Sequence, residues 1–488
     1  MKMKKIHISS IENAVGVVRR HVGECCWFNG LYFDSRKVQG DAVFVAVSGT
    51  ITDGHEYIPA AIENGAKMIV CEMLPADLQS GINYFQVSDS AAALANLASL
   101  FYGHPSQQIK LVGITGTNGK TTTATLLYRM MENLGYKTGL LSTVRNYIHE
   151  TEVLATHTTP DPVQINSLLA DMLEAGCEYC FMEVSSHAVE QKRIEGLHFD
   201  GAVFTNITHD HLDYHKTFAN YIHAKKAFFD QLDQDAFALF NSDDKNAAVM
   251  AQNTKASKKT YSLRKMSDFR LRIEEKHFEG MQLFINDKEV WTPLIGEYNA
   301  YNLLAVYAVA VLMGISENDS LQALSELKPV EGRLEAIRSE SGKTAIVDYA
   351  HTPDALKNVL STLFEFKQQG KALICVFGAG GDRDKNKRPE MGRIAALYST
   401  KLILTSDNPR SEEPEDIMND IQKGIPVEKQ AEVLKISNRK EAIKVGWSLA
   451  QAGDLILVAG KGHETYQEIQ GVKHHFDDRE VIYELINN

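Results

Sequence analysis

Residues 111–123 read LVGITGTNGKTTT, and the fold class of the chain follows from this stretch. Its apolar start, residues 111–114, predicts a short strand, and the segment Ala124–Leu134 is predicted to be a helix. Gly116 and Gly119 lie in the turn between these two elements. A strand that passes through a glycine-rich turn into a helix is typical of a phosphate-binding loop in an α/β protein.

The turn supplies the groups that a nucleoside triphosphate needs. Backbone N–H groups of such a turn point at the anion, the Lys120 ammonium adds a full charge, and the Thr121 hydroxyl is placed to ligate Mg²⁺. The first glycine lies closer to the second than in the usual G-x-x-x-x-G-K-[ST] motif, and a plain strand–turn–helix corner is the alternative interpretation. The residues assigned to ATP here are Gly116, Thr117, Asn118, Gly119, Lys120, Thr121 and Thr122.

Length and charge restrict the class of protein. A chain of 488 residues is too long for one ordinary domain and suggests about three. The net charge of −12 argues against nucleic acid as the main partner, because a phosphate backbone needs a basic face. A nucleotide or a small acidic substrate remains compatible with this charge, since local cationic loops are enough to bind it.

The cysteines and the apolar segments indicate a cytoplasmic protein. Six cysteines without a dense framework suit a reducing compartment. Cys177 and Cys180 form a single CxxC pair, which we interpret as buried thiols, with a zinc or redox role as the alternative. No apolar segment follows the basic N-terminus, and the longest apolar run, residues 303–313, is too short to span a bilayer. We therefore expect neither a signal peptide nor a membrane anchor.

The first domain, residues 1–104, is predicted to be a small α/β unit. Two of its loops, residues 34–36 and 49–55, are dense in small hydrogen-bonding groups and suit a polar ligand, although ordinary turns have the same composition. The predicted elements are the strands Val43–Val47, Met68–Cys71 and Tyr84–Val87 and the helices Ile58–Gly65 and Ala91–Tyr102.

The central domain, residues 105–331, is predicted to contain a parallel sheet. Its apolar strands at residues 181–187 and 202–206 end in polar residues, and ligands of parallel sheets bind at the carboxyl ends of the strands. Glu183 is therefore expected to be a metal ligand beside the phosphate loop, with a solvated carboxylate as the alternative.

Three further features of the central domain carry candidate ligands. Residues 208–215, THDHLDYH, resemble a metal site, and the predicted nucleotide favours Mg²⁺ over zinc. On the following helix, Lys225 and Lys226 are both predicted to be exposed from their spacing. Asn299 and Asn302 are three apart at the start of an apolar helix, which makes them either caps or contacts to the purine and ribose.

The last domain, residues 332–488, is predicted to be a second doubly wound, Rossmann-like α/β domain. Each predicted strand ends in a loop rich in polar side chains, so a ligand site is expected at that edge of the sheet. The predicted strands are Ala345–Val347, Leu373–Phe377, Leu402–Thr405 and Leu455–Val458, and the loops cover residues 348–353, 380–385, 406–410 and 460–464.

These motifs together resemble the Mur ligase family over almost the whole chain. The family has three domains, which bind a UDP-sugar, ATP and an incoming amino acid, and the chain is most similar to the members that add the third residue of the peptidoglycan stem peptide. The matching stretches are TGTNGKTT, MEVSSHA, TNITHDHLDYH, AKKAFF, EYNAYN, GRLE, DYAHTPD, GGDRDKNKRPEMG, SDNPR and AGKGHE.

The resemblance implies an ATP- and Mg²⁺-dependent ligase acting on UDP-N-acetylmuramoyl-L-alanyl-D-glutamate through an acyl phosphate. It implies that Lys225 is carbamoylated and serves, with Glu183, His211 and Thr121, as a metal ligand, and that Lys120 and Lys225 are catalytic together with Glu183 and His211. It also implies that the protein acts as a monomer.

The resemblance further assigns the substrate-binding residues. Asn302, Arg333 and Asp348 fall on positions that contact ATP. The UDP-muramoyl-dipeptide is assigned to Ser35, Thr50, Ile51, Thr52, Thr158, Thr159, Ser185, Gln191 and Arg193. The incoming amino acid is assigned to Arg383, Asp407, Asn408, Pro409, Arg410, Gly460 and Glu464.

The loop Asp407–Arg410 predicts which amine is used. Diaminopimelate carries a second carboxylate, which a guanidinium such as that of Arg410 can bind in bidentate fashion, so meso-diaminopimelate is the predicted substrate. A relative that adds L-lysine or another diamino acid, or a folylpolyglutamate-synthetase-like amide ligase, is the alternative within the enzymes. A nucleotide-gated binding module without chemistry is the alternative outside them.

Overall fold

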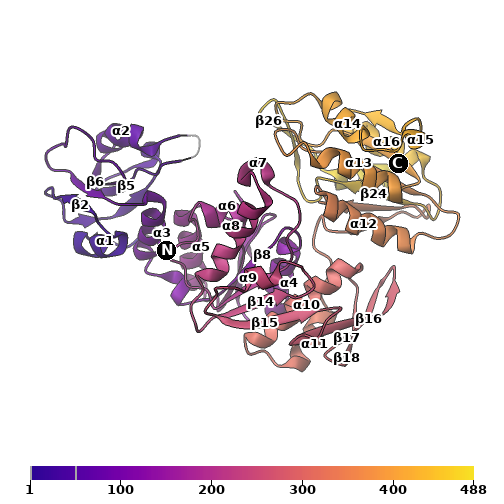
Figure 1. Cartoon of the computed structure of the whole chain (residues 1–488), viewed down its shortest axis with the longest axis horizontal. Helices are drawn as coiled ribbons and strands as arrows, with labels where there is room; N and C mark the ends of the chain where they lie inside the picture. The colour runs from indigo at the N-terminus through magenta and orange to yellow at the C-terminus, as the bar shows by residue number, and fades with distance from the viewer. Residues whose placement is uncertain (1–2, 50–51, 488) are drawn as a thin grey trace.

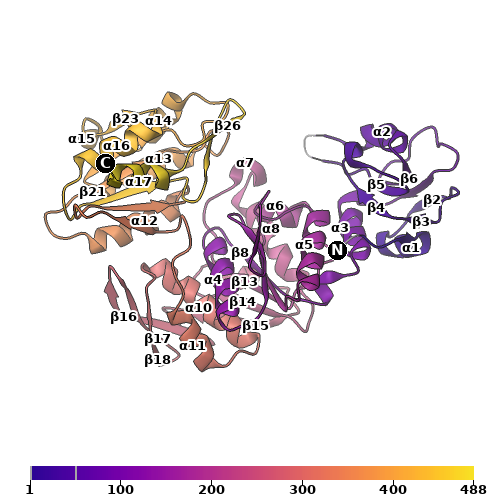
Figure 2. The ribbon, with the colours of Figure 1, turned by 180° about the vertical axis from the view of Figure 1, so that it is seen from behind.

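The computed structural model describes residues 3–49 and 52–487 of the chain. Three α/β bodies follow one another along its long axis, with the N-terminal body at one end and the C-terminal body at the other (Figures 1 and 2). Each body has its own main sheet, of five, eleven and six strands respectively. The fold is therefore mixed α/β with parallel sheets, as the sequence predicts.

The N-terminal body is a five-stranded sheet in the order β2-β7-β6-β5-β4. Strands β4 to β7 are parallel, and β2 pairs with β7 in antiparallel fashion. A two-stranded ribbon, β1 with β3, lies beside it. The elements are β1 (Ile6–His7), α1 (Ile8–Val15), β2 (Arg19–His21), β3 (Trp27–Phe28), β4 (Gly30–Tyr32), β5 (Ala42–Val45), α2 (Ile58–Glu63), β6 (Ala66–Cys71), β7 (Asn83–Gln86) and α3 (Ser90–Phe101).

The central body is built on an eleven-stranded sheet whose middle, from β9 through β12, β8, β13, β14 and β15 to β16, is parallel. Both edges are antiparallel. The strands are β8 (Lys110–Thr115), β9 (Thr138–Leu141), β10 (Asn146–Ile148), β11 (Thr151–Val153), β12 (Tyr179–Glu183), β13 (Gly201–Phe204), β14 (Phe237–Asn241), β15 (Ser257–Ser262), β16 (Phe269–His277), β17 (Gly280–Ile285) and β18 (Lys288–Thr292).

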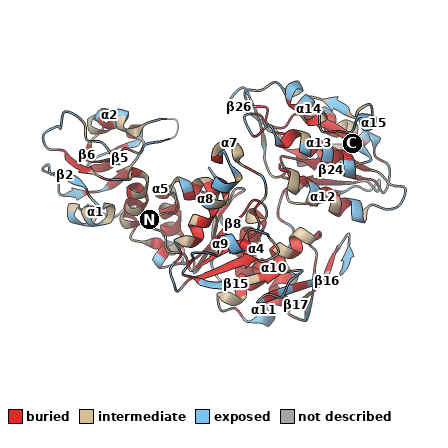
Figure 3. Cartoon of the chain, viewed as in Figure 1, coloured by how far each residue is buried: buried red, intermediate tan, exposed pale blue. Residues whose placement is uncertain are grey.

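Helices cover this sheet on both faces, and two apolar clusters fill the space between (Figure 3). The helices are α4 (Lys120–Asn133), α5 (Pro162–Glu174), α6 (Ser186–Glu190), α7 (Leu212–His215), α8 (Phe218–Asp230), α9 (Ala247–Met250), α10 (Glu297–Leu312) and α11 (Glu317–Ser325). Helix α4 begins four residues before the predicted start at Ala124, so Lys120 and Thr121 are part of its first turn. Its N-terminus therefore faces the phosphate loop directly.

The C-terminal body has a six-stranded sheet in the order β19-β20-β24-β21-β22-β23, parallel except for β19 at one edge. All four predicted strands occur. The elements are β19 (Glu335–Arg338), β20 (Thr344–Asp348), α12 (Pro353–Phe366), β21 (Leu373–Phe377), α13 (Lys387–Tyr398), β22 (Lys401–Thr405), α14 (Pro414–Gln422), α15 (Val427–Gln430), β23 (Leu434–Ile436), α16 (Arg439–Leu449), β24 (Leu455–Ala459), β25 (Tyr466–Ile469), β26 (Val472–His475) and α17 (Asp478–Asn487).

The carboxyl ends of the parallel strands in the central and C-terminal bodies face the same space between them. Residues that follow β8, β12 and β13 line it from one side, and residues that follow β20, β21, β22 and β24 line it from the other. The candidate site therefore lies at the interface between the two bodies.

Among the described residues, no helix has both the length and the apolar character needed to cross a membrane.

Candidate functional site

The phosphate loop has a backbone that only glycine allows. Gly116 has a φ of +153°, and a Cβ placed there would lie 1.9 Å from the Thr205 hydroxyl oxygen. Gly119 has a φ of +89°, and its Cβ would lie 2.5 Å from Asn302 Oδ1. Both glycines are therefore required for the loop to pack against β13 and helix α10.

Lys120 lies at the centre of this loop. Its Nζ donates hydrogen bonds to the carbonyl oxygens of Gly116 and Thr117, each over 2.8 Å. Burial lowers the pKa of the Lys120 ammonium, while the negative charges of Glu183 and Asp210 act in the opposite direction. The loop thus folds around a cation, which is the arrangement that an anionic ligand needs.

Glu183 lies at the carboxyl end of β12, as the sequence predicts, but it is fully buried and not solvated. Its Oε2 accepts a hydrogen bond of 3.0 Å from the Thr121 hydroxyl, and its Oε1 accepts one of 2.7 Å from the Thr143 backbone N–H. Strand β12 pairs with β8, so this carboxylate stands directly beside the phosphate loop. Two hard oxygen donors, Thr121 Oγ1 and Glu183 Oε2, are adjacent there.

The prediction that Lys225 and Lys226 are exposed is wrong, because both side chains are buried. Lys225 Nζ donates to the Gly116 carbonyl over 2.8 Å and lies 4.9 Å from the centre of the Tyr221 ring. Burial, followed by the charge of Lys120, holds the pKa of Lys225 well below its usual value. Lys226 instead forms an ion pair of 2.6 Å with Asp230 on the same helix.

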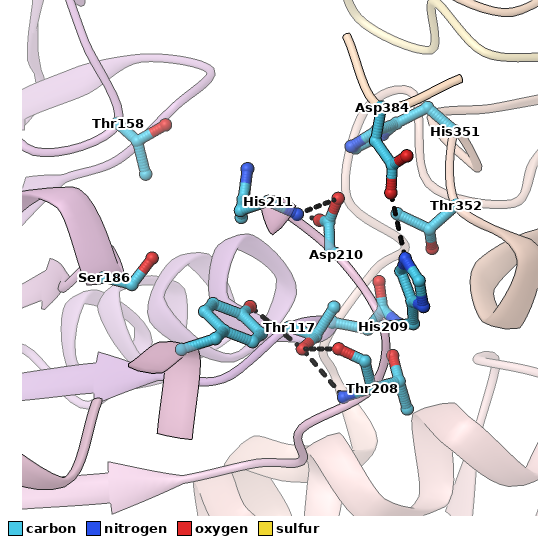
Figure 4. A network of polar contacts seen from close by, with 12 residues as sticks. Thr117, Thr158, Ser186, Thr208, His209, Asp210, His211, His351, Thr352 and Asp384 are labelled. Carbon is cyan, nitrogen blue, oxygen red and sulfur yellow. Dashed lines mark hydrogen bonds and ion pairs between the residues drawn. The ribbon is translucent and has the colours of Figure 1, made fainter. Parts of the chain in front are cut away.

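His211 lies in the loop between β13 and α7, opposite the phosphate loop (Figure 4). Burial lowers the pKa of His211 to about 3, so its ring is neutral at physiological pH and has a free lone pair. Its Nε2 lies 3.4 Å from Asp210 Oδ2. Burial acts to raise the pKa of Asp210, but the charge of Lys387 and the hydrogen bond of 2.9 Å from the His211 backbone N–H act in the opposite direction and hold that pKa below its usual value.

The histidines and aspartates of residues 208–215 do not form a metal cluster by themselves. Within residues 3–49 and 52–487, no three His, Cys, Asp or Glu side chains are grouped so that they could hold an ion. Cys177 and Cys180 are buried free thiols, as expected. A metal site at the phosphate loop would therefore need the Thr121 hydroxyl or a modified Lys225 as well.

A cavity of about 440 Å³ brings most of the predicted site residues together. It is lined from the central body by the phosphate loop, Glu183, His211 and Lys225, and from the C-terminal body by the predicted amino-acid loops. The predicted residues in its wall are Thr117, Asn118, Gly119, Lys120, Thr121, Thr158, Thr159, Glu183, Ser185, Arg193, His211, Lys225, Arg333, Arg383, Asp407, Asn408, Arg410, Gly460 and Glu464.

The residues predicted to hold the muramoyl-dipeptide end form one hydrogen-bonded group at this cavity. Arg193 donates to the Thr159 carbonyl over 2.7 Å and to Gln191 Oε1 over 2.6 Å. The Thr159 hydroxyl donates to the Glu183 carbonyl over 2.8 Å, and the Thr158 hydroxyl accepts a hydrogen bond from Thr143 over 3.1 Å. Gln191 supports Arg193 from outside the wall of the cavity.

A second cavity of about 430 Å³ adjoins the first on the other side of the phosphate loop. Asn302, Arg333 and Asp348, the predicted ATP contacts, all line it, as does Thr122. Burial raises the pKa of Asp348 to about 6. Among the described residues, Tyr298 Oη and Arg333 Nε are buried there without a hydrogen-bond partner. Such atoms are expected where a polar ligand completes the site.

The two asparagines of helix α10 have different roles. Asn299 Nδ2 donates to the Ile295 carbonyl over 2.9 Å, so this side chain satisfies the backbone that precedes the helix. Asn302 Nδ2 donates to Asn299 Oδ1 over 3.2 Å, which confirms that the two share one face. The N-cap of α10 is Gly296, which has no side-chain capping bond, so Asn299 is not a cap. Of the two asparagines, Asn302 lines the second cavity and is available to a ligand.

The C-terminal loops arrange their polar groups around Asn408. Its Nδ2 donates to Glu464 Oε2 over 2.8 Å, and the backbone of Gly460 approaches Asp407 so closely that a Cβ there would lie 2.3 Å from Asp407 Oδ2. Arg410 donates to the Gly381 carbonyl over 2.6 Å and lies 3.4 Å from Glu468. Pro409 is buried and does not line the cavity.

Contacts between the two bodies were not predicted from the sequence. His209 Nε2 lies 2.9 Å from Asp384 Oδ2, and Figure 4 shows the pair spanning the two bodies. Asn118 of the phosphate loop donates to Asp354 of α12 over 2.9 Å. Both pairs join residues that are far apart in the chain, so the sequence could not show that they pair. The one indication was that all four residues lie in the polar motifs that the sequence analysis singled out.

Of the residues predicted to hold the UDP end, the described ones, Ser35 and Thr52, belong to the N-terminal body and line neither cavity. Ser35 is buried in a short 3₁₀ turn, where its carbonyl accepts a hydrogen bond of 2.9 Å from Asn64. Thr52 is exposed, and its carbonyl accepts a bond from the Gly49 backbone. Thr50 and Ile51 lie outside the described residues.

Three domain models of one family match the chain. The model of the Mur ligase family, catalytic domain, matches residues 28–102. The Mur ligase middle domain matches residues 114–310, and the Mur ligase, glutamate ligase domain, matches residues 332–462. Together they cover all three bodies.

Individual relatives match over nearly the whole length. A protein of Bacteroides fragilis named UDP-N-acetylmuramoyl-L-alanyl-D-glutamate–2,6-diaminopimelate ligase is 56% identical over 458 residues, which are 94% of each chain. A protein of Cytophaga hutchinsonii with the same name is 56% identical over 93% of this chain and 94% of its own. A solved structure described by that name is 32% identical, with a TM-score of 0.69 and 99% of each chain covered.

Proposed function

The chain belongs to the Mur ligase family, and from this premise we propose that it joins meso-diaminopimelate to the D-glutamate of UDP-N-acetylmuramoyl-L-alanyl-D-glutamate. The reaction consumes ATP, releases ADP and phosphate, and supplies a peptidoglycan precursor. The observation that carries the proposal is the 440 Å³ cavity, because it places a phosphate loop and a loop with a candidate carboxylate-binding arginine on opposite walls of one space.

The phosphate loop and the second cavity fit ATP. Gly116 and Gly119 let the loop pack against Thr205 and Asn302, where a Cβ would clash, and Lys120 supplies the positive charge. Tyr298 Oη and Arg333 Nε have no hydrogen-bond partner in the second cavity, so they can bind the polar atoms of a purine and a ribose. Asn302 and Asp348 are the further contacts assigned to the nucleotide.

The donor set beside the loop fits Mg²⁺. Thr121 and Glu183 offer hard oxygen atoms, and the neutral ring of His211 can act as a further ligand. When bound, the ion would neutralise charge on the phosphates during transfer. These groups line the cavity at the end of the loop, which is the position that we propose for the triphosphate.

Lys225 fits the carbamoylated ligand that the family resemblance implies. Its depressed pKa leaves a neutral amine, which is the form that attacks CO₂, and the product carbamate is an anionic oxygen ligand. The neutral amine nitrogen forms a bond to the carbon of CO₂, one C=O π pair becomes the carboxylate lone pair, and the nitrogen releases one proton, so the charge at this position changes from neutral to negative. Lys226 is held by Asp230 and takes no part.

The chain's residues then bring two anions together. The loop and Lys120 hold the triphosphate, while Arg193, Thr158, Thr159 and Ser185 hold the glutamate end of the acceptor. A carboxylate oxygen attacks the terminal phosphorus, ADP departs, and an acyl phosphate forms. The amine nitrogen attacks the acyl carbon and loses a proton, phosphate leaves, and the amide bond is complete.

The C-terminal loops select the amine. Arg410 and Arg383 can bind the carboxylates of a diamino acid, and Asp407 and Glu464 can bind its ammonium groups. A diamino acid with a second carboxylate can contact both arginines, whereas lysine has only one carboxylate to bind them. Asn408 and Gly460 complete the assigned contacts, while Pro409 shapes the loop from behind.

The remaining assignments complete the proposal. Ser35, Thr50, Ile51 and Thr52 are assigned to the UDP end of the substrate, with Gln191 as support for Arg193. We divide the chain into domains 1–104, 105–331 and 332–488. Because both cavities are formed by one chain, we propose that the enzyme acts as a monomer in the cytoplasm.

A panel of amine substrates tests the proposal. ADP release should require both the UDP-muramoyl-dipeptide and an amine, and meso-diaminopimelate should give a higher kcat/KM than L-lysine. Preference for L-lysine would assign the chain to the relatives that add L-lysine. Turnover with a folate and glutamate would support the folylpolyglutamate-synthetase alternative. ATP hydrolysis that is indifferent to every acceptor would overturn the proposal.

A further inference from the structure

Lys461 is a fully buried cation directly behind the C-terminal wall of the 440 Å³ cavity, the wall that we assign to the diamino acid. It lies in the loop after β24, and its Nζ is 3.1 Å from Asn408 Oδ1 and 3.2 Å from Glu464 Oε2. Asn408 and Glu464 line the cavity, whereas Lys461 does not. A buried ammonium is costly unless it is paired, so its two partners account for its position.

Lys461 determines how Asn408 is oriented. Asn408 Oδ1 accepts from Lys461 and, over 2.9 Å, from the backbone N–H of Glu468. With two donors on the oxygen side, the amide nitrogen must point the other way, where it donates to Glu464 Oε2 over 2.8 Å. The amide has no alternative orientation that keeps these three bonds.

The same contacts leave one oxygen of Glu464 for a ligand. Oε2 accepts from both Lys461 and Asn408, while Oε1 has only a contact of 3.4 Å to the Tyr349 hydroxyl. An ammonium group in the cavity could therefore bind Oε1 without displacing either partner of Oε2.

Several charged and titratable groups face this carboxylate. Asp407, in the loop after β22, repels it and Lys461 attracts it. The Tyr349 and Tyr466 hydroxyls and the Arg439 guanidinium of α16 also interact with its charge. Burial and then Asp407 raise the pKa of Glu464, and Lys461 opposes both.

We propose that Lys461 is a positioning residue for the amine substrate, because its ammonium holds the Asn408 amide and the Glu464 carboxylate in the orientation that receives an ammonium group. The inference rests on the proposed function in one respect, the assignment of this wall to the diamino acid. Lys461 touches no reactant itself. Its effect is transmitted through Asn408 and Glu464.

The first test is Lys461→Met, which keeps an unbranched side chain and removes the charge. Without Lys461, Glu464 holds its proton up to a higher pH, and the protonated form cannot pair with an ammonium. The acid limb of kcat/KM for meso-diaminopimelate should move upward by about one pH unit, and its KM at pH 7 should rise about tenfold. The KM for ATP should stay within about twofold, since the nucleotide lies on the other wall.

Two further variants show whether the effect passes through Glu464. In a Glu464→Gln protein the acid limb should be absent, and adding Lys461→Met should raise the amine KM by less than it does in the Glu464 protein, because only the effect through Asn408 remains. Lys473→Met is the matched control, because its ammonium lies 4.2 Å from the same Tyr466 ring but on an exposed strand, whereas that of Lys461 lies at 5.6 Å. Lys473→Met should leave the pH profile unchanged.

Three results would overturn the inference: an unmoved acid limb, equal rises in the KM for ATP and for the amine, or fully additive effects in the double variant. If Lys461→Met does not fold, Lys461→Gln carries the same test, and loss of the native melting transition in both would assign Lys461 to stability alone.

Melting temperatures separate this inference from the proposed function. Wild-type protein that uses no diamino acid would refute the function. Lys461→Met should still lower the melting temperature more in the Glu464 protein than in the Glu464→Gln protein, because only the first retains a carboxylate that loses its cation. Equal decreases would refute the contact between Lys461 and Glu464.

Discussion

His209 of the central domain and Asp384 of the C-terminal domain lie 2.9 Å apart, joined across the space in which the proposed reaction takes place. The histidine is half exposed, and the aspartate is nearly buried and also accepts a hydrogen bond from the Asn386 backbone. The contact therefore connects a half-exposed side chain to a buried one, and Asp384 lines the 440 Å³ cavity.

Removing this contact should have a small effect. We expect His209→Ala to lower kcat/KM for the amine by less than about fivefold, because a partly exposed polar pair contributes about 1 kcal/mol or less. Steady-state kinetics and small-angle scattering of the same protein measure the effect on activity and on domain separation. His223→Ala, at an exposed histidine of α8, is the control. Unchanged kinetics and scattering would show that the pair does not hold the domains.

Gly116→Ala should abolish nucleotide binding. The new Cβ would lie 1.9 Å from the Thr205 hydroxyl oxygen, so the loop must move away from β13 and lose its shape. Gly135→Ala is the matched control, since Gly135 also has a positive φ but nothing lies within 4 Å of its Cβ. It should cost about 1 kcal/mol of stability and leave binding intact. Titration calorimetry with ADP measures both, and normal binding by Gly116→Ala would contradict the assignment of the loop.

Lys225→Ala should remove most of the activity. Loss of a metal ligand at the transferring phosphate should lower kcat by about 100-fold or more, or about 3 kcal/mol. A short carboxylate added to the assay should restore part of the rate, because it can occupy the position of the carbamate. Lys226→Ala, on the same helix, should reduce the melting temperature through the loss of its Asp230 pair and retain activity. A fully active Lys225→Ala enzyme would refute the carbamate.

Arg410→Ala should impair the use of meso-diaminopimelate specifically. Loss of a charged contact to one carboxylate is expected to cost about 2 kcal/mol, or about 30-fold in KM. The KM for ATP should be unchanged, and the poor rate with L-lysine should change little because lysine has no second carboxylate. A rise in KM that is equal for ATP and for the amine would place Arg410 outside the amine site.

Local sequence was sufficient wherever the relevant contacts are local. The strand before the phosphate loop, the loop itself and the four C-terminal strands with their polar ends are confirmed, since strand pattern and glycine placement depend on near neighbours. The shared face of Asn299 and Asn302 follows from helix geometry in the same way.

Tertiary contacts explain what the sequence did not predict. Lys225 and Lys226 lie on a helix whose charged positions are covered by the phosphate loop and by Asp230, and helical spacing alone carries no information about that cover. The start of α4 at Lys120 is set by the loop that precedes it. The pairing of His209 with Asp384 requires two domains to meet, and Lys461 reaches Asn408 only because the sheet brings the loops after β24 and β22 to the same edge.

The separation of the cavity into two walls has a consequence for substrate specificity. In the proposed function, activation of the carboxylate depends on the phosphate loop, and the choice of the amine depends on C-terminal loops that begin more than two hundred residues after it. Substitutions in those C-terminal loops are therefore expected to change which diamino acid is joined without altering the part of the site that consumes ATP.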